Sequence, residues 1–385
     1  NFPEVFNRTS PSQETVEMLN SLLNSLADLF NAALEKRKSV KAMKELFAES
    51  PYTPSQGIAA GIIDGYCPWN RVVEEINEME PGRFHYHHNY WNVKRRDESF
   101  GMRPVVAVVA IEGDLVDGES AHLPFLGIKL AGSSDIVNDL SATASSPNVA
   151  AIILRIDSGG GSMTAAETVF HAVKEIAARK PVVAVIGNTG ASGAYYIANA
   201  ANRIFLQDST ITGSIGVWGG KFSLKGLYEK IGVNREAIKI GEHSDMDSPD
   251  REYTKEEIEV LKEKLKYLYD LFIKRVQEGR GLDKAAVEHA AEGMVFTGKK
   301  ALELKLADQR GGLFEALEYF RDVIPDHERM VLKIYPEKGL MEKLLEDFKG
   351  TGFGAPGAID SAGIILKHMA GLGGNPLVWM PFKIY

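Results

Sequence analysis

The sequence predicts an α/β protein whose central part is a layered domain with a largely parallel sheet. Short β-branched runs alternate with helix-forming segments along this part, which is the pattern of βαβ units. Two glycine-rich turns follow strands directly, one after Ile156 and one after Ile186. In parallel sheets functional residues lie at the carboxyl ends of strands, so these turns mark the expected site.

Composition excludes several classes of protein. The chain has 385 residues, 44% of them hydrophobic and 25% charged, which is ordinary for a globular protein with more than one domain. A net charge of -8, with the basic residues dispersed, argues against nucleic-acid binding. The single cysteine, Cys67, excludes an intrachain disulfide and a thiolate metal cluster. The sequence has no apolar run of the roughly eighteen residues that a membrane span needs.

A helix near the start of the chain recurs far downstream. Ser10 and Pro11 mark the start of a helix whose apolar stripe has Val16 as its first residue. Thr254 marks the start of a second helix, whose apolar stripe begins at Ile258 and has the same spacings. A later threonine and a closing aspartate also recur in the same order, so we infer an internal repeat. We therefore divide the chain into a helical end of an incomplete amino-terminal repeat (1–80), a linker with a strand (81–103), a complete carboxyl-terminal repeat (104–325) and a tail (326–385).

The linker contains one feature that needs interpretation, and the tail contains two. His85 and His87 would share one face of a strand, but the corresponding segment after the second copy of the repeat, 330–335, carries no metal ligands, which favours an aromatic strand with exposed histidines over a metal site. We expect no metal and no organic cofactor. In the tail, an amphipathic helix is predicted at 344–348, and the apolar run 376–381 is either an interface or a docked strand.

The elements of the complete repeat follow from the alternation of apolar runs and turns. Strands are predicted at 105–111, 149–156, 181–186 and 203–206, and helices at 134–141 and 164–178. The third strand runs into Gly190, Ala191, Ser192 and Gly193, and a helix begins there.

Ser192 is the candidate nucleophile. Its hydroxyl lies at a helix N-terminus, where free amides and the helix dipole favour a developing negative charge. Serine is also a common N-cap at such a turn, so a structural role stays open, and a serine nucleophile needs a base. The turn after Ile156 contains Gly160 and Gly161, whose amides can approach an oxyanion closely. Neither turn matches a phosphate-binding motif. We therefore expect an oxyanion hole formed by Gly160 or Gly161 with the amide of Gly193.

Three motifs taken together resemble the signal peptide peptidase A family, also called protease IV. They are Arg155-Ile156-Asp157-Ser158-Gly159-Gly160-Gly161-Ser162, Ala191-Ser192-Gly193-Ala194-Tyr195-Tyr196-Ile197-Ala198 and Thr212-Gly213-Ser214-Ile215-Gly216-Val217. The resemblance covers nearly the whole chain and points to the long, tandem-repeat form of the family. It implies the fold of the Clp protease and crotonase superfamily, a repeated β-β-α spiral, here with helical extensions. One departure is Gly159, which stands where the family usually has proline.

The resemblance also implies a function. It implies a Ser/Lys peptidase that degrades hydrophobic peptides such as cleaved signal peptides, with Ser192 as nucleophile and Ser214 helping to hold the general-base lysine. It further implies a homo-oligomer at the bacterial cytoplasmic membrane, with the catalytic domain outside the cytoplasm. We expect the substrate to bind in extended form against strand edges near Ser192.

The position of the base lysine is the main open point. Ser244 stands where short members of the family carry it, and long members take it from the amino-terminal half. We therefore expect the chain to be truncated at its amino terminus, with the base supplied from before Asn1. Lys239 and His243 are the alternatives within the chain, His243 giving a Ser/His arrangement.

Other functional classes stay open beside the peptidase. A crotonase-like acyl-CoA enzyme would share the fold and the oxyanion turns without needing the serine. A non-catalytic scaffold that binds hydrophobic peptides is a second alternative. We set an α/β-hydrolase aside because Ala194 occupies the last glycine position of the required Gly-x-Ser-x-Gly motif.

Overall fold

The computed structural model describes residues 4, 8–36, 43–79, 102–123, 127–336 and 377–379. The predicted aromatic strand with His85 and His87 and the predicted helix at 344–348 lie outside these residues. The chain forms two compact units, one of residues 1–22 with 103–385 and the other of residues 23–102. The repeat boundaries inferred from the sequence stay a prediction. Among the described residues, no helix is both long and apolar enough to span a membrane.

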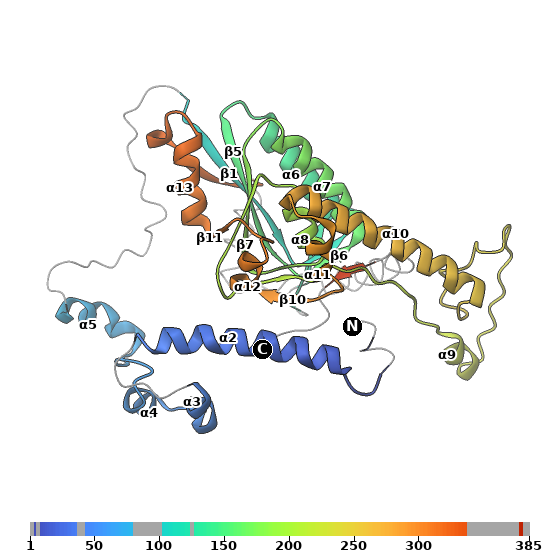
Figure 1. Ribbon diagram of the computed structural model, residues 1–385, viewed down its shortest axis with the longest axis horizontal. Helices are drawn as coiled ribbons and strands as arrows, with labels where there is room; N and C mark the ends of the chain where they lie inside the picture. The colour runs from blue at the N-terminus through green and yellow to red at the C-terminus, as the bar shows by residue number, and fades with distance from the viewer. Residues whose placement is uncertain are drawn as a thin grey trace, which may run out of the picture. The chain divides into compact units, whose positions relative to one another are not determined.

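A main sheet of eight strands forms the centre of the larger unit within the described residues (Figure 1). In spatial order its strands are β10 (Val295–Thr297), β9 (Ile211–Gly213), β7 (Val182–Ala191), β5 (Val149–Ser158), β1 (Val105–Glu112) and β12 (Val331–Tyr335), while β8 (Arg203–Leu206) pairs with β7 and with β11 (Gln309–Arg310). Apart from the antiparallel pair of β9 with β10, all pairs are parallel. The predicted parallel sheet is confirmed.

A second sheet lies beside the carboxyl ends of the main strands. Its strands are β13 (Leu377–Trp379), β6 (Gly160–Ser162), β2 (Asp114–Val116), β4 (Ile128–Gly132) and β3 (Ala121–Leu123). The chain passes from β1 into β2 and from β5 into β6; α7 (Met163–Ala177) follows β6 directly, and α6 (Ser133–Ser145) follows β2 after the hairpin of β3 and β4. This is the predicted β-β-α spiral.

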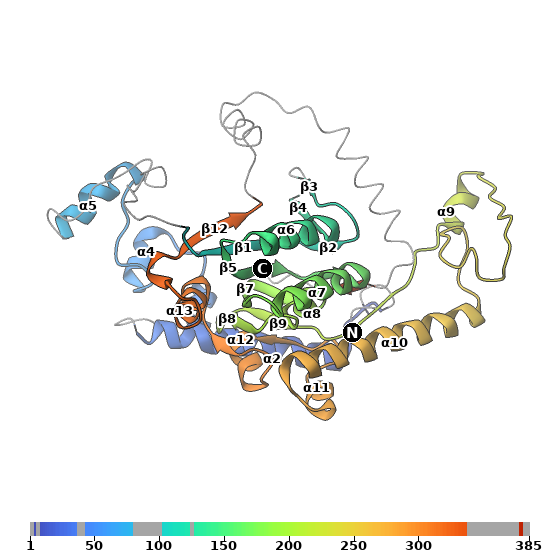
Figure 2. The same ribbon diagram turned by 90° about the horizontal axis from the view of Figure 1, so that it is seen from above.

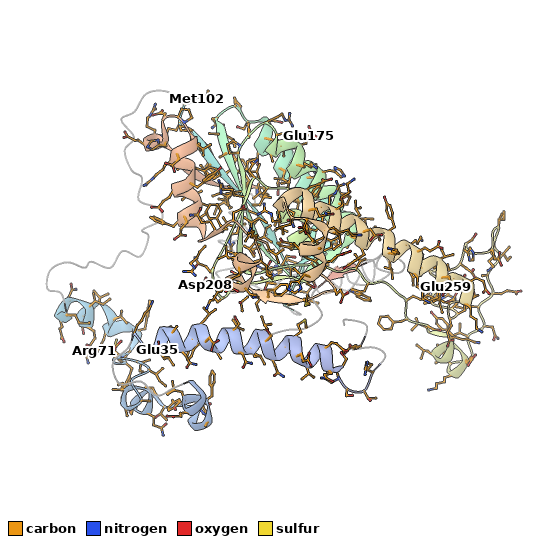
Figure 3. All side chains as sticks on the ribbon, in the orientation of Figure 1. Glu35, Arg71, Met102, Glu175, Asp208 and Glu259 are labelled. Atoms are coloured by element: carbon orange, nitrogen blue, oxygen red, sulfur yellow. The ribbon has the colours of Figure 1, made fainter. Side chains whose placement is uncertain are left out.

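Helices cover both faces of the main sheet (Figure 1). On one face, α6 and α7 pack with α8 (Gly193–Ala198) and α10 (Lys255–Arg280) over the large apolar core, which includes Leu154, Phe170 and Phe272. On the other face, α13 (Leu313–Val323) buries Phe320 against Phe205. The strands between the two layers are apolar on both sides, as buried parallel strands require. Charged side chains such as Glu175 and Glu259 lie on the outer surface (Figure 3).

The remaining elements of this unit connect the layers. They are α9 (Lys225–Lys230), α11 (Lys284–His289), α12 (Gly298–Glu303) and the 3-10 helix His327–Arg329. Residues 218–254 form an arm that carries α9 and extends beyond the N-terminal end of α10 in both views (Figures 1 and 2). The arm is tied to α10 by Arg251, whose guanidinium contacts Glu257 and Asp245.

The first part of the chain is helical. It contains α2 (Gln13–Leu34), α3 (Met43–Glu49), α4 (Pro54–Ala59), the 3-10 helix Trp69–Arg71 and α5 (Val72–Met79). Thr53 caps α4 by accepting a hydrogen bond from the Gln56 amide, and Thr297, its counterpart in the inferred repeat, caps α12 in the same way.

The third predicted strand is longer than its apolar run. Strand β7 continues through the glycine turn to Ala191, because Thr189, Gly190 and Ala191 pair in parallel with β9. The sequence prediction ended this strand at 186, where the apolar run stops, and was wrong on this point. Backbone pairing with a strand that comes later in the chain leaves no periodicity in the run itself.

Candidate active site

Ser192 occupies the sharp turn between β7 and α8. Its backbone has φ 55° and ψ -122°, a region that residues with a side chain rarely adopt. Its side chain is 1% exposed, and its Oγ has no hydrogen-bond partner among the described residues. Strain of this kind persists only when the surrounding structure enforces it, and it gathers at functional sites.

The sequence around Ser192 folds this way because its neighbours are small. A Cβ added to Gly190 would lie 2.4 Å from Cγ2 of Ile186, so only glycine fits there. The Ser192 amide donates to the Gly213 carbonyl at 2.8 Å, and the Tyr196 amide donates to the Ser192 carbonyl at 2.8 Å. Both sides of the turn are thereby fixed.

The first glycine-rich turn lies beside this one. Ser158 of β5 pairs with Gly190 of β7, and β6 follows directly and packs against α8. Gly160 and Gly161 have φ of 100° and 152°, and a Cβ on Gly161 would lie 2.2 Å from the Leu115 carbonyl oxygen. The Gly160 amide donates to Ser158 Oγ at 3.2 Å. The turn is therefore built for close approach of backbone to backbone.

Gly193 is the first residue of α8, a position whose amide has no partner within its own helix. The structure thus brings all three predicted oxyanion residues to the surroundings of Ser192. Whether their amides hold an oxyanion stays a prediction.

Ser214 lies next to Ser192 through the pairing of β9 with β7. Ala191 is opposite Gly213 in that ladder, and Ser214 follows with φ 52° and 3% exposure. Its amide donates to the Met294 carbonyl at 2.6 Å. Thr212 Oγ1 donates to the Gly190 carbonyl at 2.6 Å, which ties the third motif to the nucleophile turn. The three motifs that are separate in the sequence therefore meet at one end of the main sheet.

The two alternative bases are held in the arm. Lys239 Nζ lies 2.7 Å from Asp245 Oδ1, and His243 Nδ1 lies 3.7 Å from Glu257 Oε1. Hydrogen bonds from Arg251 and Lys239 hold the pKa of Asp245 well below its usual range. The arm extends away from α8 (Figures 1 and 2), so the structure does not bring either side chain to Ser192.

Sequence reasoning gave no role to two sets of residues near the site. Asp157, within the first motif, accepts a hydrogen bond from the Thr189 amide at 3.2 Å and so braces the nucleophile turn. Glu167, Tyr196 and Arg275 form a network around α8. Tyr196 is part of the second motif, but Glu167 and Arg275 lie outside all three motifs, so the sequence alone offered no signal for the network.

Comparison with known proteins shows the family. The model of "Peptidase family S49" matches residues 174–322. A putative protease of Synechocystis is 36% identical over 191 residues, and the match covers 69% of that protein and 50% of this chain. The chain belongs to peptidase family S49. The predicted resemblance to signal peptide peptidase A is confirmed.

The S49 chain is also similar to a longer protein and to a solved structure. It is 30% identical over 330 residues to the chloroplastic serine protease SPPA of Arabidopsis thaliana, with 80% of this chain and 47% of that protein covered. The chain thus spans about half the length of the Arabidopsis relative. A solved mutant of the 1510-N membrane-bound stomatin-specific protease has a TM-score of 0.39 at 14% identity, covering 61% of this chain and 99% of that one.

Proposed function

We propose that the chain carries the nucleophile of a serine endopeptidase that cleaves hydrophobic peptides, such as cleaved signal peptides, by a Ser/Lys mechanism. The observation that carries the proposal is Ser192: a buried, strained serine whose hydroxyl has no hydrogen-bond partner among the described residues. Membership of family S49 supports the same chemistry.

The arrangement supports acyl transfer in two steps. Ser192 Oγ attacks the scissile carbonyl while a general base removes its proton, and the amine leaves with a proton from that base. The negative charge on the carbonyl oxygen is stabilised by the Gly193 amide together with Gly160 or Gly161. Water then attacks the acyl-enzyme by the same route. In this proposal Ser214 holds the base lysine, which comes from a segment outside the present sequence.

The second sheet supports an extended peptide as substrate. Strand β13 of the tail pairs antiparallel with β6, with Val378 opposite Gly161 and Trp379 opposite Gly160. An extended segment with an apolar sequence therefore already lies along the strand that leads into the oxyanion turn. Strand addition of this kind uses main-chain hydrogen bonds for affinity and side-chain pockets for selectivity. Because β6 lies between β13 and β2, we propose that hydrophobic substrates bind along β6 in the same manner by taking the place of β13.

The setting of the enzyme is part of the proposal. We place it at the bacterial cytoplasmic membrane, with the catalytic domain outside the cytoplasm, as the resemblance implies. We also propose a homo-oligomer, because the arm exposes Phe222, Ile238 and Ile240, which a partner surface would cover.

Peptidase activity on a leucine-rich signal-peptide substrate tests the function. The chain is assayed alone and after co-refolding with the upstream half of the long form, with Ser192→Ala as the inactive variant and Ser244→Ala as the matched control. We expect turnover only in the reconstituted pair, abolished by Ser192→Ala and unchanged by Ser244→Ala.

Three other outcomes would change the proposal. Turnover by the chain alone, lost in Ser192→Ala, would contradict the upstream base and direct attention to Lys239 or His243. Peptide binding without turnover in either preparation would favour the non-catalytic scaffold. Retention on immobilised CoA, with no peptide turnover, would favour the acyl-CoA enzyme.

A further inference from the structure

Helix α8, which presents Ser192, is too short to hold its own position. It has six residues, and a helix of that length is not stable without tertiary contacts. All six residues are buried. Whatever fixes α8 also fixes Ser192 Oγ and the Gly193 amide, because both lie at its first turn.

Two neighbouring tyrosines anchor α8 by their hydroxyl groups. Tyr195 donates to the Leu306 carbonyl at 2.7 Å, and Tyr196 donates to Glu167 Oε2. Burial raises the pKa of both phenols far above the usual range, so both hydroxyls stay protonated and act as donors. The two bonds leave the helix in different directions, one towards the turn after α12 and the other towards α7.

Glu167 connects this helix to two others. Its Oε2 accepts the Tyr196 hydroxyl, while its Oε1 lies 2.7 Å from Arg275 Nη2 of α10 and 3.0 Å from His171 Nε2 of α7. Burial alone would raise the pKa of Glu167, but hydrogen bonds from Arg275 and Tyr196 lower it, so the group stays a carboxylate. One carboxylate thus joins α7, α8 and α10.

Aromatic rings enclose the same network. The Arg275 guanidinium lies 4.7 Å from the centre of the Phe170 ring, and Tyr196 makes edge contacts with Phe170 at 5.2 Å and with Phe272 at 4.9 Å. The Arg275 side chain is only 13% exposed. Charged hydrogen bonds in such surroundings are directional and strong, so they favour one position of α8 over others.

We propose that Glu167 and Arg275 are positioning residues that act through Tyr196 to hold Ser192 and the Gly193 amide in their reactive geometry. The inference rests on the proposed function, because it assigns the network to the reaction of Ser192. The Tyr196 amide donates to the Ser192 carbonyl, so a shift at Tyr196 is transmitted directly to the strained turn. Small misplacements of a nucleophile reduce the rate of reaction without weakening substrate binding.

Tyr196→Phe is the central variant, because it removes one hydroxyl and leaves the pair of Glu167 with Arg275 in place. Tyr319→Phe makes the same chemical change on α13, on the other face of the main sheet. Lys266→Gln removes an exposed ion pair, with Asp270, on α10. Glu167→Gln is the second test variant, since it retains an acceptor for Tyr196 while losing the charge that Arg275 contacts.

Two measurements are made on each protein: kcat and KM of the reconstituted peptidase, and hydrogen–deuterium exchange of the segment 192–198. We expect Tyr196→Phe and Glu167→Gln to lower kcat by about tenfold with KM within about twofold, and to speed exchange in that segment. Both control variants should match the wild type in kcat and in exchange of α8.

Several results would overturn the inference. These are unchanged exchange of 192–198 in Tyr196→Phe, faster exchange with unchanged kcat, or a loss of kcat that Tyr319→Phe reproduces. If the wild type shows no turnover, the proposed function fails, and the exchange of α8 still shows whether the network holds Ser192.

Discussion

At the scale of single residues, the candidate site depends on backbone positions that only glycine can fill. A Cβ at Gly161 would collide with the Leu115 carbonyl oxygen, and a Cβ at Gly190 would collide with the side chain of Ile186. Ser192 itself adopts a positive φ despite its side chain. Close packing of the backbone around one strained serine is what brings the two turns together.

The tightest of these positions gives a direct test. We expect Gly161→Ala to destabilise the protein by about 2 kcal/mol or more, because its Cβ would lie 2.2 Å from the Leu115 carbonyl oxygen and force β6 away from β2. Urea unfolding measures the loss. Gly118→Ala is the matched control: Gly118 also has positive φ, at 85°, but open space around it. If both variants lost the same free energy of unfolding, the positive φ would be the cause of the destabilisation, and the lack of space for a Cβ would not.

At the scale of elements, α10 connects the sheet to the arm. Its N-terminus has a capping box in which Thr254 accepts from the Glu257 amide and Glu257 accepts from the Thr254 amide. The same Glu257, 1% exposed, holds Arg251 through two hydrogen bonds of 2.6 and 2.7 Å. Arg251 also holds Asp245, so this one ion-pair cluster anchors the arm to the helix.

This cluster predicts a pH dependence of stability. Hydrogen bonds from Arg251 lower the pKa of Glu257 from its ordinary value of 4.5 to about 2. A lowered pKa in the folded state adds stability that is present above the unfolded pKa and is lost as the pH falls through the folded pKa. The stabilisation from Glu257 should therefore decline between about pH 4.5 and pH 2.

Thermal unfolding of Glu257→Gln against the wild type measures this effect, since glutamine keeps the capping acceptor and removes the charge. The wild type should unfold at the higher temperature at about pH 6, and the difference should narrow as the pH falls from about 4.5 towards about 2. A difference that stays constant over this range would contradict the assigned cause.

At the scale of the whole molecule, exposed apolar side chains gather on the arm. Phe222, Leu227, Ile231, Ile238 and Ile240 are all more than half exposed in the isolated chain. Exposed apolar surface on a projecting segment is typical of an interaction site. Together with the family resemblance, it supports the proposed homo-oligomer.

Sedimentation velocity tests this assembly. We expect Ile238→Asp with Ile240→Asp to shift the protein from an oligomer to a monomer, because two charges would be buried at the contact. The control is Phe314→Asp, which changes an exposed apolar residue of α13, outside the arm, and should leave the assembly intact. A wild type that sediments as a monomer would contradict the role of the arm in self-association.

Local patterns in the sequence were sufficient to predict much of this protein. Alternation of apolar runs with turns predicted the parallel sheet, and its helices start or end within a few residues of the expected positions. Small residues between a strand and a helix pointed to Ser192 as the candidate. These features are local because a strand, a helix start and a tight turn each depend on neighbouring residues.

Contacts between distant segments were decided only by the tertiary structure. The extension of β7 to Ala191 needs β9, and the pairing of β6 with β13 joins residues far apart in the chain. The link of Tyr196 through Glu167 to Arg275 needs three helices folded together. Hydrogen bonds and ion pairs of this kind depend on spatial proximity and leave no periodic signal in a single sequence. The sequence alone therefore determined the layers, through the alternation of apolar runs with turns, and the nucleophile turn, through its small residues. Packing of the helices against the sheet determined what holds that turn in place.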